Sequence, residues 1–266
     1  MESFVPIAAG ILAAVILLYV AVEYLRSRLR YRKHPIPPTE TEAASLEESP
    51  KRSPFDLEEA PEGAAGKFAV IDFQTTGLTL EEGAEDKIIQ AAWLLLDEDF
   101  RVLSRRLSLV RQTEASGVEA EQIHHIPYEK ILRYGLPEET VLEDLWQEIT
   151  GEVVLVFHNA SFDLGIWHAA LSRLAPEQAS DLEEKETFCT MTFFPELSAG
   201  DREEKYLTLG ALTCRLTGEE PANPAYSRGL TAWRNVCLTR VCLRELFRQY
   251  PEEAEAHIAH AKEFLR

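Results

Sequence analysis

The longest apolar run of the chain is residues 4–22 (FVPIAAGILAAVILLYVAV), which contain no charged side chain. A helix over this run, at a rise of ~1.5 Å per residue, spans about 28 Å, close to the hydrocarbon thickness of a bilayer. A cleaved signal peptide is the alternative, but such peptides carry basic residues before the apolar run, and here the basic residues follow it. We therefore expect residues 1–33 to form a membrane anchor and a basic juxtamembrane segment, with the C-terminal side in the cytoplasm.

The next segment, residues 34–66, shows neither a helical nor a strand period. It is rich in Pro, Glu, Ser and Ala. This composition is typical of a disordered, extended linker. We expect it to separate the anchor from a folded domain at residues 67–250.

From residue 68 onward, short apolar runs and longer amphipathic stretches alternate. The pattern predicts strands at 68–73, 88–97, 101–110 and 153–157. It predicts helices at 138–150, 161–174, 206–217 and 230–249, and a charged C-terminal helix within residues 251–266. Strands mixed with helices in this way favour one α/β domain in which helices cover a sheet.

The charge of the chain narrows the choice of partners. Of its 266 residues, 27 are Lys or Arg and 45 are Asp or Glu, which gives a net charge of −18. This acidity counts against tight nucleic-acid binding, which usually uses a basic surface. The main basic run of the domain comprises Arg101, Arg105, Arg106 and Arg111. We interpret it as a solvated strand face, with a phosphate-contacting strip as the alternative.

The cysteine pattern gives no sign of a metal or redox motif. Cys189, Cys214, Cys237 and Cys242 form no C-x-x-C pair and lie in apolar surroundings. We expect reduced core thiols, which agrees with a cytoplasmic domain.

Two segments carry candidate chemistry. Residues 72–77 (DFQTTG) follow the first predicted strand, where an acid and a polar turn with Gly would face a ligand. Residues 158–163 (HNASFD) follow the buried strand at 153–157 and open a helix. The acid of this second segment, Asp163, would lie in the first helical turn, where the helix dipole also favours a carboxylate.

Together, these two segments resemble the motifs of the DEDD superfamily of 3′–5′ exonucleases. The DEDDh branch, which includes the proofreading subunit of bacterial DNA polymerase III and ribonuclease T, has the motifs D-x-E-T-T-G and H-N-A-x-F-D. Residues 122–126, 189–191 and 207–218 resemble further segments of that family. The resemblance covers residues 68–249 and implies a ribonuclease H-like fold, in which three layers surround a mixed central sheet.

The chain departs from the family at three positions. Gln74 replaces the Glu of the first motif. In the third motif, which matches residues 230–239, Leu230 replaces the His and Asn235 replaces the Asp. The four metal-holding positions are therefore Asp72, Gln74, Asp163 and Asn235, of which only Asp72 and Asp163 keep a carboxylate.

These departures matter because the family uses two Mg²⁺ ions, held by four carboxylates, and a His as general base. At ~4 Å and an effective dielectric constant of ~20, each lost charge removes on the order of 4 kcal/mol of attraction to a neighbouring cation. Loss of a general base costs about 10²–10⁴ in rate. We expect Asp72 and Asp163 to hold metal only weakly, with Mg²⁺ or Mn²⁺ as the cofactor of any remaining activity.

The resemblance and the three substituted positions leave three possible functions. The first is a catalytically impaired exonuclease-fold domain under a membrane, which binds a nucleic-acid end, a nucleotide or a protein. The second is an active exonuclease with a relaxed metal site, and the third is a membrane-proximal scaffold. The resemblance implies a terminal-nucleotide pocket built from six residues: Thr75, Thr76, Gly77, His158, Asn159 and Phe162.

Overall fold

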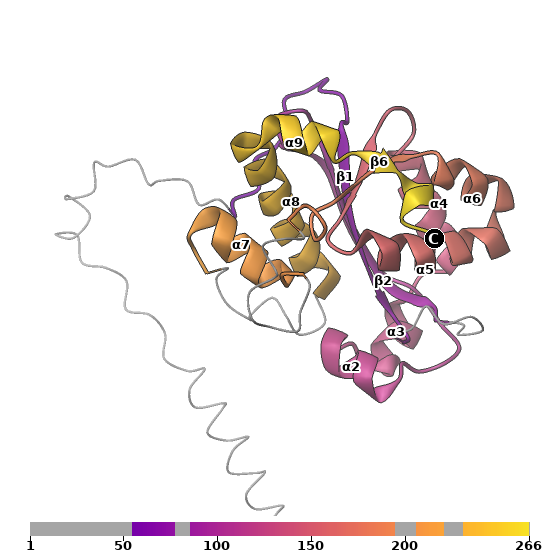
Figure 1. Ribbon diagram of the computed structural model, residues 1–266. Coiled ribbons are helices and arrows are strands. Elements are labelled where there is room, and N and C mark those ends of the chain that lie inside the picture. The colour runs from indigo at the N-terminus through magenta and orange to yellow at the C-terminus, as the bar shows by residue number, and fades with distance from the viewer. Residues whose placement is uncertain (1–54, 78–85, 195–205, 221–230, 266) are drawn as a thin grey trace, which may run out of the picture. The chain divides into compact units, whose positions relative to one another are not determined.

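A six-stranded mixed sheet forms the centre of the part of the chain that the computed structural model describes, residues 55–77, 86–194, 206–220 and 231–265 (Figure 1). The strand order is β3-β2-β1-β4-β5-β6. The strands are β1 (Phe68–Thr75), β2 (Ile88–Leu96), β3 (Val102–Leu109), β4 (Val154–Phe157), β5 (Glu186–Cys189) and β6 (Ala259–His260). The pairs β1–β4 and β4–β5 are parallel, whereas β1–β2, β2–β3 and β5–β6 are antiparallel.

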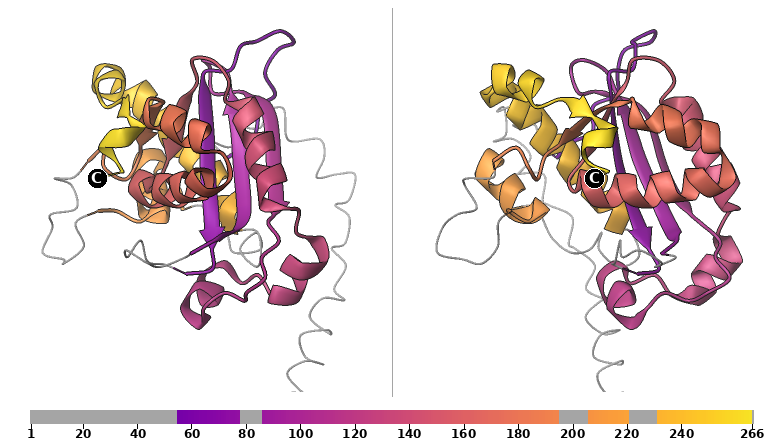
Figure 2. Two further views of the ribbon diagram at one scale, coloured as in Figure 1. Left: turned by 90° about the vertical axis from the view of Figure 1, so that its right-hand side faces the viewer. Right: turned by 45° about the vertical axis from the view of Figure 1, so that its right-hand side comes forward.

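Helices cover both faces of this sheet, and Figure 2 shows the layers from two further sides. One face carries α4 (Glu138–Glu148), α5 (Ala160–Leu174) and α6 (Pro176–Glu183). The other carries α7 (Leu209–Thr217), α8 (Thr231–Gln249) and α9 (Pro251–Ala256). Two short helices, α2 (Val118–His124) and α3 (Tyr128–Tyr134), lie at the end of the sheet where β1 finishes. The 3-10 helix η4 (Ala261–Glu263) follows β6.

Successive side chains of β1 point to opposite faces of the sheet, and both sets are apolar, which explains why helices cover both faces. Ala69, Ile71 and Phe73 belong to the core under α4 and α5, whereas Phe68 and Val70 belong to the core under α8. A strand buried on both faces reads as a continuous apolar run, as this one does. The polar residues at its end therefore emerge between two packed helix layers.

The predicted α/β fold with a mixed sheet is confirmed. The four predicted strands and the helices at 138–150, 161–174, 206–217 and 230–249 appear with slightly different ends. The predicted C-terminal helix is wrong beyond Ala256, because the chain there turns into β6 and η4. The pattern also missed α2, α3, α6 and β5, which are short. All four cysteines are free thiols, as expected, but only Cys189 and Cys242 are buried, whereas Cys214 and Cys237 are partly exposed.

The predicted linker extends too far into the folded domain. Glu59 forms a parallel β-bridge with Val102 at the outer edge of β3, where the Ala60 N–H donates to Val102 O at 2.9 Å. Arg240, which is 2% exposed, donates from Nη1 to Asp56 O and from Nε to Phe100 O, both at 3.0 Å. Residues 55–60 are therefore an ordered strap on the domain, and we refer to them as the N-terminal strap.

The predicted membrane anchor, residues 4–22, lies outside the described residues, as does the remainder of the predicted linker before residue 55. Within the described ranges, no helix combines the length and the apolar character needed to cross a bilayer.

Candidate active site

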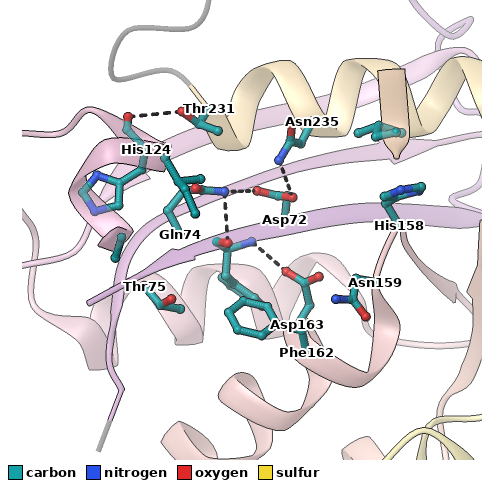
Figure 3. Close-up of a pocket in the computed structure, with 14 residues that line it drawn as sticks. Asp72, Gln74, Thr75, His124, His158, Asn159, Phe162, Asp163, Thr231 and Asn235 are labelled. Atoms are coloured by element: carbon teal, nitrogen blue, oxygen red, sulfur yellow. Dashed lines mark hydrogen bonds between the residues drawn. The ribbon is translucent and has the colours of Figure 1, made fainter. Parts of the chain in front are cut away.

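A pocket of ≈ 210 Å³ lies at the end of β1, between the first turns of α5 and α8 and the short helix α2 (Figure 3). It brings together residues from all three motifs that the sequence singled out. The predicted site residues that line it are Asp72, Gln74, Thr75, His158, Asn159, Phe162, Asp163 and Asn235. The topology accounts for this convergence, because β1 and β4 are parallel neighbours and their carboxyl ends meet at one edge.

Two amides hold the carboxylate of Asp72. Gln74 Nε2 donates to Asp72 Oδ2 at 2.7 Å, and Asn235 Nδ2 donates to Asp72 Oδ1 at 3.0 Å. Figure 3 shows the two amides reaching this carboxylate from β1 and from α8. Each oxygen of Asp72 therefore already accepts a hydrogen bond within the protein.

Asp163 connects α5 to the strand that carries Asp72. Its side chain is 4% exposed, and its Oδ1 accepts a hydrogen bond from the Phe73 N–H at 3.0 Å. The parallel register of β1 with β4 runs only from Phe68 to Val70, so Asp163 takes a strand N–H beyond the last registered pair. This bond fixes the start of α5 against the end of β1.

Burial is the main cause of the shifted pKa values of Asp72 and Asp163. Burial raises the pKa of Asp72 to about 7, although the hydrogen bonds from Asn235 and Gln74 lower it. Burial and the neighbouring Asp72 charge together raise the pKa of Asp163 well above its usual range, against the effect of the Phe73 N–H. Near neutral pH the two carboxyls therefore carry less than two negative charges.

The second motif forms the turn from β4 into α5. His158 is half-buried, its Nδ1 lies 3.0 Å from Thr190 Oγ1, and burial lowers its pKa to about 4. The backbone oxygen of Asn159 accepts hydrogen bonds from the N–H groups of Phe162 and Asp163, both at 3.1 Å. His158 is therefore neutral and held by Thr190, an arrangement that suits a role in shaping the turn.

Two predicted residues, Thr76 and Gly77, do not line the pocket, and a third lies outside the described residues. Thr76 and Gly77 continue the turn after β1: Thr76 Oγ1 accepts the Lys87 N–H at 2.9 Å, and the Gly77 oxygen accepts a hydrogen bond from Thr75 Oγ1. A Cβ at Gly77 would lie 2.0 Å from Asp86 Oδ1, so any side chain there would displace Asp86. Leu230 lies outside the described residues.

The sequence motifs assigned no role to the pocket wall that α2 forms. Ala120, Ile123 and His124 of α2 form this wall, and Leu209 and Thr231 also line the pocket. The resemblance of residues 122–126 to a family segment was the available signal, but it gave no role to a particular side chain. Thr231 Oγ1 donates to His124 O at 3.1 Å, which connects α2 to the start of α8.

The donor set does not fit the two metal ions that the family resemblance implies. Two of the four ligand positions hold amides, and these amides turn their N–H groups toward Asp72. An N–H group cannot ligate a cation, and Mg²⁺ gives up its water reluctantly to weak ligands. Within the described ranges, no three or more His, Cys, Asp or Glu side chains are grouped so that they could hold a metal ion.

Comparisons with known proteins agree with the fold and the motifs. The model of a family described as exonuclease, the RNase T family, matches residues 69–221. Among curated proteins, none matches the chain's sequence significantly.

Solved structures of exonuclease I share the fold. One matches with a TM-score of 0.57 and 16% identity over 72% of this chain and 43% of its own. The zinc-bound complex of E. coli exonuclease I with single-stranded DNA matches with a TM-score of 0.57, 16% identity, and coverage of 72% and 42%. Exonuclease I from Methylocaldum szegediense matches with a TM-score of 0.56, 15% identity, and coverage of 72% and 42%.

The chain thus spans less than half the length of the exonuclease I structures that it resembles. Their low identity to this chain speaks for the fold alone, whereas the family match covers more than half of the chain. With the two motifs at one end of β1, this match identifies the chain as a member of the exonuclease (RNase T) family, within the DEDDh-type exonuclease superfamily.

Proposed function

We propose that this domain is impaired as a phosphodiester hydrolase and acts by binding a nucleic-acid end, a nucleotide or a protein partner. The observation that carries the proposal is the pair of amide donors on Asp72. In the two-metal scheme, the corresponding positions neutralise and orient the cations that clamp the attacking and leaving oxygens. Here the same positions satisfy a carboxylate without any cation.

The general base is also missing. Leu230, which takes the place of the family's His, has no atom that could accept a proton. The two histidines that line the pocket have their Nδ1 atoms engaged, His124 by the Ile126 N–H at 2.9 Å and His158 by Thr190 Oγ1. Burial also lowers the pKa of both rings to about 4, which makes each a weak base near neutral pH.

A hydrolysis assay tests the proposal. The full-length protein is incubated with a 3′-labelled single-stranded oligonucleotide in Mg²⁺ and in Mn²⁺, beside an Asp72→Asn variant. We expect no metal-dependent shortening by either protein. Shortening that the Asp72→Asn variant lacks would overturn the proposal and favour the active exonuclease with a relaxed metal site.

Restoring the family's residues distinguishes an impaired site from a site that never supported the reaction. The triple change Gln74→Glu, Asn235→Asp and Leu230→His supplies the two carboxylates and the base. If the fold still positions these groups, metal-dependent shortening should appear in the triple variant. A gain of several orders of magnitude would show that these three substitutions cause the impairment.

A pure scaffold role is less consistent with the geometry. A scaffold needs no hollow at Asp72 and Asp163, whereas these residues line a pocket of ≈ 210 Å³. We therefore propose ligand binding at this pocket ahead of a scaffold function.

The proposal also includes tethering. Residues 4–22 are apolar and are followed by basic residues, which supports a membrane anchor with the domain on the cytoplasmic side. Fractionation of cells that express the full-length chain tests this. Release of the chain from membranes by high-salt or carbonate washes would contradict an integral anchor.

A further inference from the structure

One residue of β2 is polar where the rest of its face is apolar. Gln90 points to the face that α8 covers, as Ala92 and Leu94 do further along the strand. Its side chain is 1% exposed. A polar side chain at such a position destabilises a fold unless it is hydrogen-bonded. Its presence therefore points to a specific contact with α8.

That contact is made with the first turn of α8. Gln90 Oε1 accepts a hydrogen bond from the Ala232 N–H at 3.2 Å, and both residues are buried. Ala232 is the second residue of α8, and the N–H groups of a first turn have no carbonyl partner within their own helix. Gln90 therefore caps α8 from a strand that lies 142 residues earlier in the chain.

The same turn carries one of the two amides that hold Asp72. Asn235 follows Ala232 by three residues, and residues three apart are neighbours on a helix surface. A helical side chain also leans toward the N-terminus of its helix, so the Asn235 side chain extends over the turn that Gln90 caps. Its Nδ2 donates to Asp72 Oδ1 at 3.0 Å. The position of this donor thus depends on how the first turn is fixed.

A small displacement of this turn would break the contact with Asp72. A slip of α8 by one residue moves its surface by ~1.5 Å along the axis and by about 100° around it. The 3.0 Å bond of Asn235 would not survive such a shift, because N–H···O bonds rarely exceed ~3.2 Å. Apolar packing of α8 on the sheet is non-directional, whereas a buried hydrogen bond specifies one arrangement. The bond from Ala232 to Gln90 therefore supplies the register that packing alone does not.

Gln90 also lies next to the second amide on Asp72. The register of β1 with β2 pairs Gln74 with Gln90. Paired residues of neighbouring strands have Cβ atoms about 4.5–5.5 Å apart, on the same face of the sheet. Gln74 Nε2 donates to Asp72 Oδ2 at 2.7 Å. One buried glutamine thus stands beside one donor to Asp72 and caps the helix that carries the other.

On these grounds, and resting on the proposed function, we propose that Gln90 is a positioning residue for the Asn235–Asp72 contact. It fixes the first turn of α8 against β2 and thereby places Asn235 Nδ2 on Asp72 Oδ1. A second bond, from Thr231 Oγ1 to His124 O, fixes the same turn against α2. Gln90 lies outside the three sequence motifs, so its role is separate from the roles of the motif residues.

Hydrogen exchange in the full-length protein tests the cap without a mutation. The N–H groups of a first helical turn exchange fast when they have no partner. The second residue of α4, Glu139, provides the internal comparison, because it is exposed and the N-cap of α4 offers no side-chain bond. We expect the Ala232 N–H to exchange at least about tenfold more slowly than the Glu139 N–H. Equal rates for the two would overturn the inference.

Gln90→Met tests the positioning role, because Met has nearly the shape of Gln but no acceptor oxygen. The readout is hydrogen exchange of the Asn235 side-chain amide, measured by nitrogen NMR after selective labelling of the asparagines, which are Asn159, Asn223 and Asn235. We expect this exchange to be at least about fivefold faster than in the wild type, the value of roughly one hydrogen bond. Gln90→Glu keeps an acceptor oxygen and should restore the slow rate.

Gln112→Met is the matched control. Gln112 is also buried at this end of the sheet, but its Nε2 donates to Ile88 O of β2 at 2.7 Å. This variant should lose stability as well, yet leave the exchange of the Asn235 amide within about twofold of the wild-type rate.

The outcomes separate this inference from the proposed function. Equal acceleration in Gln90→Met and Gln112→Met, or no acceleration in Gln90→Met, would overturn the positioning role alone. Should Gln90→Met not fold, the exchange of the Ala232 N–H in the wild type and in Gln90→Glu decides the question. Metal-dependent shortening of a labelled oligonucleotide by the wild type would instead overturn the proposed function.

Discussion

Amides stand at two of the four positions where the exonuclease family has metal-holding carboxylates, and both donate to Asp72. Because Gln and Glu, like Asn and Asp, have nearly the same shape, the backbone of β1 and α8 needs no adjustment. The N–H groups replace the attraction of a cation with two hydrogen bonds of 2.7 and 3.0 Å. We infer that the pocket is stable as it stands, without metal.

Reversing both amides should therefore destabilise the domain. In the variant with Gln74→Glu and Asn235→Asp, two hydrogen bonds to Asp72 are lost and four carboxyls crowd one pocket. We expect the free energy of unfolding to fall by about 2–4 kcal/mol, and Tm by roughly 5–15 °C, in the absence of divalent ions. Addition of Mn²⁺ should raise the Tm of this variant again, whereas the wild-type Tm should not respond.

Gln147→Glu provides the control for this experiment, since Gln147 also donates to a carboxylate, Glu143 Oε1 at 3.0 Å, but on the exposed face of α4. Its Tm should change little and should not depend on Mn²⁺. A wild-type protein that is itself strongly stabilised by Mn²⁺ would show that the amides do not exclude metal.

The raised pKa of Asp72 makes the effect of Asp72→Asn depend on pH. The folded-state pKa of about 7 lies above the unfolded value of about 3.9, so folding favours the protonated form. The stability contributed by this carboxyl is present at low pH and is lost as pH rises through 7. Asn cannot ionise, and its presence also removes the charge that raises the pKa of Asp163.

We therefore expect Asp72→Asn to stabilise the domain more at pH 8 than at pH 5, by on the order of 2 kcal/mol. Urea unfolding of both proteins at the two pH values measures the difference. An equal effect at both pH values would mean that Asp72 is ionised in the folded state throughout this range.

The sequence predicted the side of the pocket that carries the Asp side chains better than it predicted the opposite wall, which is formed by α2. Asp72, Asp163 and Asn235 could be placed because each belongs to a motif with a fixed relation to a strand or helix. His124 could not be placed, because its position depends on what surrounds it after folding. Its neighbour Thr231, 107 residues away, is not encoded in a local pattern.

At the scale of elements, prediction succeeded where local periodicity and tertiary packing agree. The C-terminal segment shows a conflict between them: its sequence has a helical pattern, yet the helix stops at Ala256. Strand pairing wins there, because Thr187 and Glu186 of β5 pair with Ala259 and His260. Such long-range pairing overrides local propensity and is invisible along the chain.

The N-terminal strap is a second element that composition misrepresented. Its acidic, Pro-flanked sequence resembles a linker, yet Glu59 pairs with Arg105 and the buried Arg240 binds Asp56 O. Phe55 and Leu57 pack against the core under α8. A strap of this kind covers part of the exposed edge of β3, which would otherwise present unpaired backbone groups.

Two truncations should separate the strap from the residues before it. Removal of residues 1–54 leaves every described strap contact intact, so the Tm should stay within about 2 °C of the full-length value. Removal of residues 1–62 deletes the bridge to Val102 and the partner of Arg240. We expect a loss of about 2–4 kcal/mol, because two backbone hydrogen bonds to Val102, the hydrogen bond from the Arg240 side chain and two apolar contacts disappear. Equal Tm values for the two truncations would contradict a stabilising strap.

For the whole molecule, the negative sign of the net charge says more about binding to phosphates than its size does. The arginines of the predicted basic run are largely paired with acids: Arg101 with Asp99, Arg105 with Glu59, and Arg106 with Asp144. These pairs leave little free positive charge on β3 for contact with phosphates. The net charge of −18 is therefore not offset by a basic strip at this strand.

The salt dependence of oligonucleotide binding should follow from this distribution. A protein that uses 6–10 phosphate contacts gains about 10³–10⁵ in affinity when salt falls from 200 to 50 mM. Here repulsion between the acidic domain and the strand is screened less at low salt, so affinity should stay constant or fall. Fluorescence anisotropy with a labelled single strand at both salt concentrations gives the slope. A steep gain at low salt would reveal a basic surface that receives the phosphate backbone, and the pocket would then be one part of a nucleic-acid interface.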